Sequence, residues 1–311
     1  MSLLKILFNC PREDYAEQFV SKYIPYLKFN RVVDLGGEAL ILQCRDARLD
    51  VTRIVKIARP ELKEIAKQRF IRSNKTLCSL QSPYFPTVLY LQENPLFVIL
   101  DWASGNTLEE YIKSNSYSIS RNIKIFQDLC KAVQILHERN IIHRDIKPLN
   151  IVVNGQTKLI DFGLAKKKND SGLTQTEYAL GTTNYAAPEQ IEDAANVDQR
   201  ADVFSLGKIF YFLTTKKETW APELLEDSRL MEFFCEAISF NRDDRIPTVK
   251  KLIEKFSEIY HLQEKSDYSK IDAFEDLFIH FAGNTSRIKY YTKLTNKEII
   301  KLYSALRERH T

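Results

Sequence analysis

Apolar residues fall in short runs along the first third of the chain, in the pattern typical of β-strands. Three such runs, rich in valine, isoleucine and leucine, occupy residues 31–35, 38–44 and 51–58. Residues 60–80 instead place apolar side chains at helical spacing, with Pro60 at the start. Residues 87–102 predict two more strands around the turn QENP. This part of the chain therefore predicts a mostly antiparallel sheet accompanied by one helix.

The pattern changes to helical periodicity after residue 102. Residues 107–115 predict a short helix, and residues 120–140 predict a long amphipathic one. The apolar stripe of the long helix consists of Ile123, Phe126, Leu129, Val133 and Leu136. Short strands around IIH, NIVVN and TKLID follow, then a polar loop at 164–186, and helices dominate beyond it. These elements predict a larger, mainly helical second lobe.

The predicted elements define an α+β, two-lobed organisation with a small β-rich N-lobe and a larger helical C-lobe. Five segments follow: an extension at 1–30, the small lobe at 31–100, a hinge at 101–105, the large lobe at 106–260, and a C-terminal extension at 261–311. The last of these segments reads as two further amphipathic helices. We find no internal repeat or low-complexity tract.

Composition narrows the classes of protein to consider. Hydrophobic residues make up 44% and charged residues 28% of the 311 residues, as in soluble globular proteins. The net charge of +4 is too small to indicate a dedicated nucleic-acid binder. The sequence shows no apolar stretch long enough to span a membrane and nothing resembling a signal peptide at its start. Five cysteines without C-x-x-C spacing predict a reducing compartment, and we expect the cytoplasm.

Three motifs occur in order in the second lobe. HRDIKPLN spans residues 143–150, DFG spans residues 161–163, and APE spans residues 187–189. Together they resemble the eukaryotic-type protein kinase family, and the resemblance covers about residues 31–260. It implies the two-lobed protein kinase fold and transfer of phosphate from ATP, with Mg²⁺, to a protein.

The resemblance assigns roles that suit the chemistry of phosphoryl transfer. Asp145 would accept the proton of the substrate hydroxyl, and Lys147 would lie near the transferred phosphate as a point charge. Asn150 and Asp161 would hold Mg²⁺ through hard oxygen ligands. Lys147, together with Thr182 in GTTNYAAPE, indicates serine and threonine acceptors. The partner is then a protein substrate, and the chain itself is a further candidate acceptor.

Other residues of the large lobe resemble structural positions of the family. His143 is expected to pack beneath Phe162 rather than to carry protons. Asp202 is expected to bond the backbone of the catalytic loop, and Arg245 to pair with Glu189 of the APE motif, in a pair that would destabilise the fold if broken. Arg144 is expected to attract an anion, which in this family is often a phosphate on the activation loop.

The resemblance also places the nucleotide in the small lobe and hinge. Lys56 matches the strand lysine that contacts the α- and β-phosphates. Leu100 matches the gatekeeper at the back of the adenine pocket. The backbone atoms of Asp101 and Ala103 would form hydrogen bonds with the edge of the adenine. The complete expected set is Gly36, Gly37, Ile41, Lys56, Leu100, Asp101 and Ala103.

The small lobe departs from the family pattern at two places. Counting back from Lys56 puts Asp34 and Ala39 at two of the three glycine positions, so that only Gly36 is kept. The carboxylate expected on the helix falls at Ser73, which offers a hydrogen bond but no charge. Lys56 is therefore expected to lack its usual partner.

These departures leave three hypotheses open. The first is an active serine/threonine protein kinase, favoured by the complete large-lobe motifs. The second is a catalytically weak or inactive kinase-like scaffold or switch, favoured by the changes in the small lobe. The third, a kinase-fold enzyme acting on a small molecule, is disfavoured by the GTT and APE segments, which would shape a peptide-binding ledge.

Overall fold

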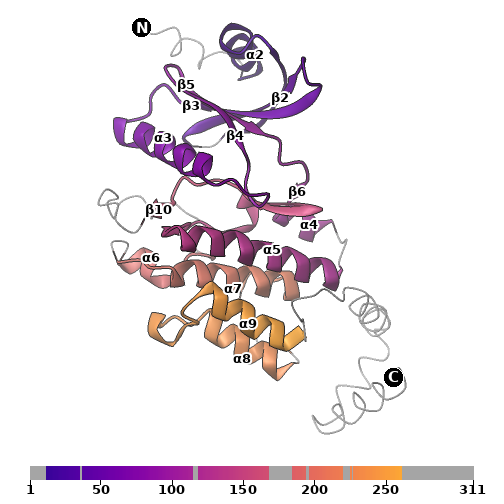
Figure 1. Cartoon of the computed structure of the whole chain (residues 1–311), viewed down its shortest axis with the longest axis vertical. Helices are drawn as coiled ribbons and strands as arrows, with labels where there is room; N and C mark the ends of the chain where they lie inside the picture. Colours follow the sequence, from indigo (N-terminus) through magenta and orange to yellow (C-terminus); the bar gives the residue numbers. More distant parts are fainter. Residues whose placement is uncertain are drawn as a thin grey trace.

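The protein has two lobes joined by one connecting segment, as the computed structural model shows (Figure 1). The structure describes residues 12–35, 37–114, 118–167, 184–193, 196–219, 225 and 227–260. The first lobe contains the sheet and the second is mainly helical (Figure 1). The predicted α+β, two-lobed fold is therefore confirmed.

The small lobe is built on a five-stranded antiparallel sheet in the order β1-β2-β3-β5-β4. Its strands are β1 (Leu27–Leu35), β2 (Ala39–Asp46), β3 (Val51–Ala58), β4 (Val88–Glu93) and β5 (Leu96–Asp101). Helix α3 (Glu64–Ser79) lies between β3 and β4 in the chain. It begins later than predicted, because Pro60 lies in a turn in which the N–H of Leu62 donates to the carbonyl of Arg59. β1 begins four residues earlier than predicted.

The alternation of strand residues separates two apolar clusters. In β3 and β5, Ile54, Val98 and Leu100 belong to the main core, whereas their neighbours Val55 and Ile99 belong to a second cluster. This second cluster covers the sheet on its other side. The central strands β3 and β5 therefore contribute buried side chains to both faces of the sheet.

Helix α2 (Arg12–Tyr23) covers the second face of the sheet (Figure 1). Tyr15, Ala16, Phe19 and Val20 are almost completely buried in this cluster. The ring of Phe19 meets that of Phe97 edge-on at 5.6 Å between centroids. The sequence had suggested only an extension at 1–30, but residues 12–23 form part of the packed small lobe.

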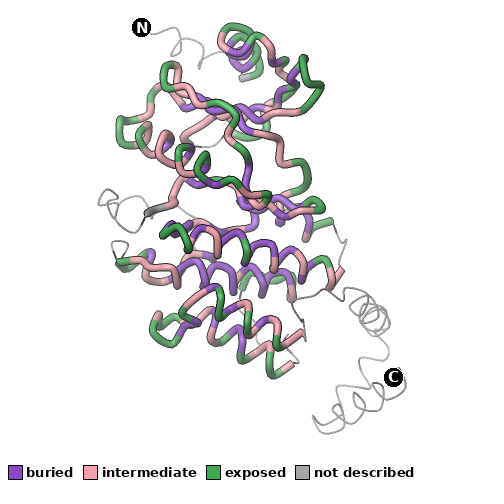
Figure 2. The backbone as a smooth tube through the Cα atoms, viewed as in Figure 1, coloured by how far each residue is buried: buried purple, intermediate pink, exposed green. Residues whose placement is uncertain are grey.

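The large lobe is organised around two long helices, α5 (Ile119–Glu138) and α7 (Arg200–Thr215). All five residues of the predicted stripe on α5 are buried. Twelve of the 16 residues of α7 are buried, which makes it the central helix of this lobe (Figure 2). Phe126 stacks on Phe210 of α7 at 4.5 Å, and Phe256 contacts both rings.

Smaller elements complete the large lobe and carry its loops. The helices are α4 (Leu108–Lys113), α6 (Pro188–Glu192), α8 (Ser228–Ala237) and α9 (Val249–Tyr260). The strands are β6 (Asn106–Thr107), β7 (Ile141–Ile142), β8 (Ile151–Asn154), β9 (Gln156–Leu159) and β10 (Lys166–Lys167), with the 3-10 turns η1 (Pro148–Asn150) and η4 (Arg242–Asp244). β8 pairs with β6 and β9, and β7 pairs with β10.

The helices expected at 261–311 lie outside the described residues. Within the part of the chain that is described, no helix is both long and apolar enough to cross a membrane.

Candidate active site

The loop between β7 and β8 brings three of the predicted residues together around one carboxylate. The ammonium of Lys147 lies 2.9 Å from Oδ2 of Asp145. The side-chain amide of Asn150 donates to the same oxygen at 2.8 Å and to the backbone carbonyl of Asp145 at 2.9 Å. Because both bonds use the amide nitrogen, the Oδ1 of Asn150 takes part in neither of them. Asp145 is thus held in one orientation by two neighbours.

A buried carboxylate on α7 holds the backbone of this loop. Asp202 accepts the N–H of His143 and the N–H of Arg144, each at 2.8 Å, and its Oδ2 lies 2.8 Å from the ring of His137. Burial alone would raise the pKa of Asp202, but these donors outweigh it and lower that pKa. Arg144 has the left-handed φ of 65°, which is uncommon outside glycine and needs such support. The predicted contact of Asp202 with the loop backbone is confirmed.

His143 belongs to the scaffold of the loop. Its side chain is completely buried, and its ring lies 4.9 Å from that of Phe162, edge-on. Burial lowers the pKa of His143 despite the nearby carboxylates Asp202 and Asp145. The ring is therefore neutral at physiological pH, and the expected packing against Phe162 is confirmed.

Asp161 stands at the turn after β9. It has a φ of 67°, and its Oδ1 accepts the N–H of Gly163 at 3.1 Å. Although its side chain reaches solvent, the surrounding protein alone would raise its pKa by desolvation. The positive charge of Lys56 and the bond from Gly163 outweigh this effect, so the pKa of Asp161 lies below its usual value. Asp161 is thus a carboxylate whose charged form is favoured by the positive charge of Lys56.

The net shift of the pKa of Asp145 has the opposite direction, because burial is the dominant effect there. Burial raises the pKa of this carboxyl, and the neighbouring Lys147 only partly offsets the rise. A carboxylate with a raised pKa binds a proton more strongly than an ordinary aspartate, so it is the better general base of the two. The two aspartates therefore differ in the way that separate roles require.

Lys56 projects from the middle of the small-lobe sheet, where it pairs with Ile41 of β2 and Val98 of β5. Among the described residues, no carboxylate oxygen lies within 4.0 Å of its ammonium. The hydroxyl of Ser73 on α3 donates to the carbonyl of Phe70 in the same helix, at 2.9 Å. The hydroxyl of Ser73 thus forms its hydrogen bond within its own helix.

The other predicted nucleotide residues are placed as follows. Leu100 is buried beside Ile54, with which it pairs across β3 and β5. Asp101 is the last residue of β5, where it pairs with Arg53, and its backbone N–H donates to the carbonyl of Thr87 at 3.0 Å. Ala103 follows in the segment that connects the lobes, Gly37 is exposed, and Gly36 lies outside the described residues.

Helix α6 is connected to the catalytic loop by a residue that the sequence analysis missed. Gln190 is buried, its Nε2 donates to the carbonyl of Arg144 at 2.7 Å, and its Oε1 accepts the N–H of Ala187 at 3.2 Å. Next to it, Glu189 forms the predicted pair with Arg245, at 2.6 and 3.0 Å. The only sequence signal for Gln190 was its position directly after APE.

The segment before α6 is attached to α7 and to the residues just after it by contacts that the sequence did not indicate. Glu218 accepts bonds from Asn184 at 3.2 Å and from the hydroxyl of Tyr185 at 3.1 Å. The carbonyl of Tyr185 accepts the hydroxyl of Ser205 at 2.8 Å. Thr182 and the acceptors of the preceding loop lie outside the described residues.

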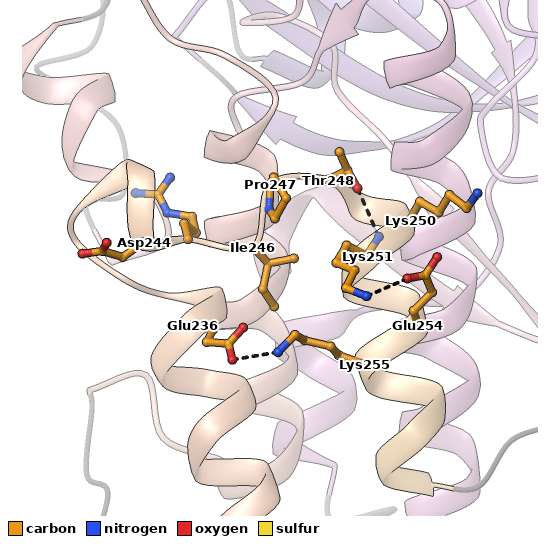
Figure 3. Close-up of a pocket in the computed structure, with 10 residues that line it drawn as sticks. Glu236, Asp244, Ile246, Pro247, Thr248, Lys250, Lys251, Glu254 and Lys255 are labelled. Carbon is orange, nitrogen blue, oxygen red and sulfur yellow. Dashed lines mark hydrogen bonds and ion pairs between the residues drawn. The ribbon is translucent and has the colours of Figure 1, made fainter.

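A separate groove of about 530 Å³ lies between α8, η4 and the start of α9 (Figure 3). Two of its lysines are paired, Lys251 with Glu254 at 3.1 Å and Lys255 with Glu236 at 2.7 Å. None of the predicted active-site residues lines it, so it has no part in the site around Asp145.

Comparison with known proteins agrees with this geometry. The family model described as "Protein kinase domain" matches residues 28–303 of this chain. The chain belongs to the protein kinase family. It is 30% identical over 237 residues to serine/threonine-protein kinase PknB of Mycolicibacterium smegmatis, covering 72% of this chain and 36% of that protein. The identity is 32% over 233 residues with PknB of Mycobacterium tuberculosis, covering 71% and 36%. The chain thus spans about a third of the length of these relatives.

Membership of the protein kinase family implies the use of ATP and Mg²⁺, and two of the residues present have the oxygen donors that this metal prefers. Mg²⁺ prefers oxygen ligands and is commonly held by one or two carboxylates together with substrate phosphates. Asp161 supplies a charged carboxylate, and Asn150 supplies Oδ1. Within the described residues, no group of three or more His, Cys, Asp or Glu side chains forms an all-protein metal site. One carboxylate and one amide oxygen would leave room for phosphate oxygens and water on the same ion.

Proposed function

We propose that the protein is an ATP- and Mg²⁺-dependent serine/threonine protein kinase, which transfers the γ-phosphate to a serine or threonine hydroxyl. The observation that carries the proposal is the arrangement around Asp145, whose carboxylate is oriented by Lys147 and Asn150. The names of the relatives support the acceptor class. The third hypothesis, a small-molecule kinase, has no observation in its favour.

In the proposed reaction, the acceptor hydroxyl oxygen attacks the γ-phosphorus while the bond to the β-phosphate oxygen breaks. Asp145 takes the proton that the hydroxyl loses, and its raised pKa favours this transfer. Lys147, 2.9 Å from Asp145, lies where it can offset charge on the phosphate oxygens. Asn150 and Asp161 would hold Mg²⁺, which neutralises the phosphates, and Lys56 would contact the α- and β-phosphates.

We also propose that the small lobe lacks two features of the family. Asp34 and Ala39 would replace two glycines of the phosphate turn, and Ser73 would replace the helix carboxylate that orients Lys56. The bond from Ser73 to the carbonyl of Phe70 supports the second substitution, because it directs the hydroxyl to its own helix. We expect slower turnover as a result.

A second candidate, a catalytically weak or inactive kinase-like scaffold or switch, rests on this same observation. If Lys56 needs a helix carboxylate to hold the phosphates productively, the site would bind nucleotide without efficient transfer. Kinetics separate an active enzyme from an inactive scaffold, because the scaffold has no transfer rate to lose when Asp145 is changed.

The test is transfer of radiolabelled γ-phosphate to a generic basic protein and to the chain itself. The wild type should label an acceptor, whereas Asp145→Asn should abolish labelling and leave nucleotide binding almost intact. Asn241→Asp, in an exposed turn of the large lobe, serves as a control for nonspecific effects of an Asn/Asp exchange. Equal labelling by wild type and Asp145→Asn would refute the enzyme and favour the scaffold.

We further propose that the protein works in a reducing compartment, the cytoplasm. The free thiols of Cys44, Cys78, Cys130 and Cys235 support this. Fractionation of cells that express the chain would test it.

A further inference from the structure

Helix α3 contacts the glycine turn, the segment around Gly37 that connects β1 and β2, through an ion pair. The guanidinium of Arg69 meets the carboxylate of Glu38, the residue between Gly37 and β2. Arg69 precedes Ser73 by one helical turn, so the two side chains leave the same side of α3. The side chains of Arg69 and Glu38 are 18% and 37% exposed, so the pair is partly withdrawn from solvent.

Glu38 is also attached to the sheet beside Lys56. Its carbonyl accepts the N–H of Arg59 at 2.9 Å, at the end of β3. Three residues farther along β2, Ile41 pairs with Lys56. Any displacement of Glu38 is therefore transmitted both to the glycine turn and to the strand pair that carries Lys56.

Few residues of helix α3 are buried. Three of its 16 residues, Phe70, Asn74 and Leu77, are buried, and Lys63 makes no side-chain cap at its start. A second ion pair, Lys75 with Glu93 at 3.2 Å, ties the C-terminal half of the helix to β4, but both side chains are more than half exposed. The Arg69–Glu38 pair thus connects the N-terminal half of α3 to the turn.

We propose that Arg69 is a positioning residue, which holds the glycine turn in place over the nucleotide phosphates by its ion pair with Glu38. This inference rests on the proposed function. In this chain α3 would act on the phosphates through the turn, and no longer through a carboxylate on Lys56. A movement of α3 away from the sheet would break the pair and release the turn.

The pair also sets the charge beside the glycine turn. Glu38 places a negative charge beside a turn that must receive phosphates, and Arg69 neutralises that charge. If charge alone mattered, loss of Glu38 would improve nucleotide binding. If position matters, loss of either partner weakens binding, and exchange of the two partners restores it because pair and net charge are both kept.

The experiment measures the Kd of a non-hydrolysable ATP analogue with Mg²⁺, together with KM for ATP and kcat. The variants are Arg69→Met, Glu38→Gln and the exchange Arg69→Glu with Glu38→Arg. Lys75→Met, which removes the other ion pair of the same helix, is the matched control. We expect each single variant to raise Kd and KM about fivefold with a smaller change in kcat. The exchange should recover most of the loss, and Lys75→Met should match the wild type.

The outcomes separate this inference from the proposed function. Tighter binding by Glu38→Gln, no recovery in the exchange, or an equal effect of Lys75→Met would overturn the positioning role. A wild type that binds the analogue but transfers no phosphate would refute the proposed activity, yet the comparison of Kd values would still decide the role of Arg69.

Discussion

At the scale of single residues, the two aspartates of the site differ in their readiness to bind protons. Asp145 has a raised pKa because burial outweighs the attraction of Lys147, whereas the charge of Lys56 helps to lower the pKa of Asp161. A general base must be deprotonated to act, so activity should fall as the pH drops through the pKa of Asp145. The two residues can therefore be told apart by their pH dependence.

We predict that the acidic limb of the kcat profile lies above the ordinary aspartate value of about 3.9. In Lys147→Met the limb should move to still higher pH, because the cation that lowers the Asp145 pKa is gone. Profiles normalised to their own maxima measure this shift separately from any loss of rate. A limb that stays in place, or moves to lower pH, would contradict Asp145 as the base.

Asp161 gives a prediction of a different kind. Asp161→Asn removes the charge of a proposed metal ligand, so it should abolish most of the gain in ATP affinity that Mg²⁺ provides, about tenfold or 1.4 kcal/mol. Calorimetric titration with and without Mg²⁺ measures that gain. Asp145→Asn is the control and should keep it. A similar Mg²⁺ effect in both variants would remove Asp161 from the metal site.

At the scale of elements, a substitution on α3 tests the proposal that Lys56 lacks a helix carboxylate. Ser73→Glu should place a carboxylate near Lys56 and raise kcat about tenfold, which corresponds to about 1.4 kcal/mol of barrier. Ser79→Glu is the matched control, since Ser79 is exposed on the same helix and also donates to a carbonyl three residues back. An unchanged or lower rate in Ser73→Glu would mean that another group already serves Lys56.

The loop at 164–186 offers a second element to test, although most of it lies outside the described residues. Arg144 belongs to the catalytic loop, and we predict phosphorylation at Thr174 or Thr176 that orders this loop through Arg144. Mass spectrometry of active protein should find phosphate at one of these positions, and Thr174→Ala with Thr176→Ala should lower activity severalfold. Full activity without phosphate there would contradict the prediction.

Helix α2 is the element that the sequence analysis placed outside the lobes. Phe19 is completely buried against the sheet, so Phe19→Ala should destabilise the protein by about 3 kcal/mol. Glu17→Ala changes an exposed position on the same helix and should have little effect. Thermal unfolding measures both. Equal melting temperatures would mean that α2 does not pack on the sheet in solution.

At the scale of the whole molecule, the local patterns of the chain were enough for the architecture. Alternation in the strands and the stripe on α5 predicted two lobes, because each pattern reflects a surface that must be buried. The motif residues Asp145, Lys147 and Asn150 were also predictable, since they lie within six positions of one another and meet through a single loop. Contacts between residues this close in the sequence can be expected from the sequence alone.

The tertiary structure decided which surfaces and charges meet across longer distances. Asp202 reaches the catalytic loop across 58 residues, and Arg245 reaches Glu189 across 56. Only the resemblance to a family had suggested these two contacts. Nothing in the sequence indicated the hydrogen bond from Gln190 to Arg144, the ion pair of Glu38 with Arg69, or the packing of α2 on the sheet. Each partner is an ordinary polar or apolar residue in its own neighbourhood. The periodicity of a segment shows that it has a face to bury, but the face that receives it depends on how the whole chain folds back on itself.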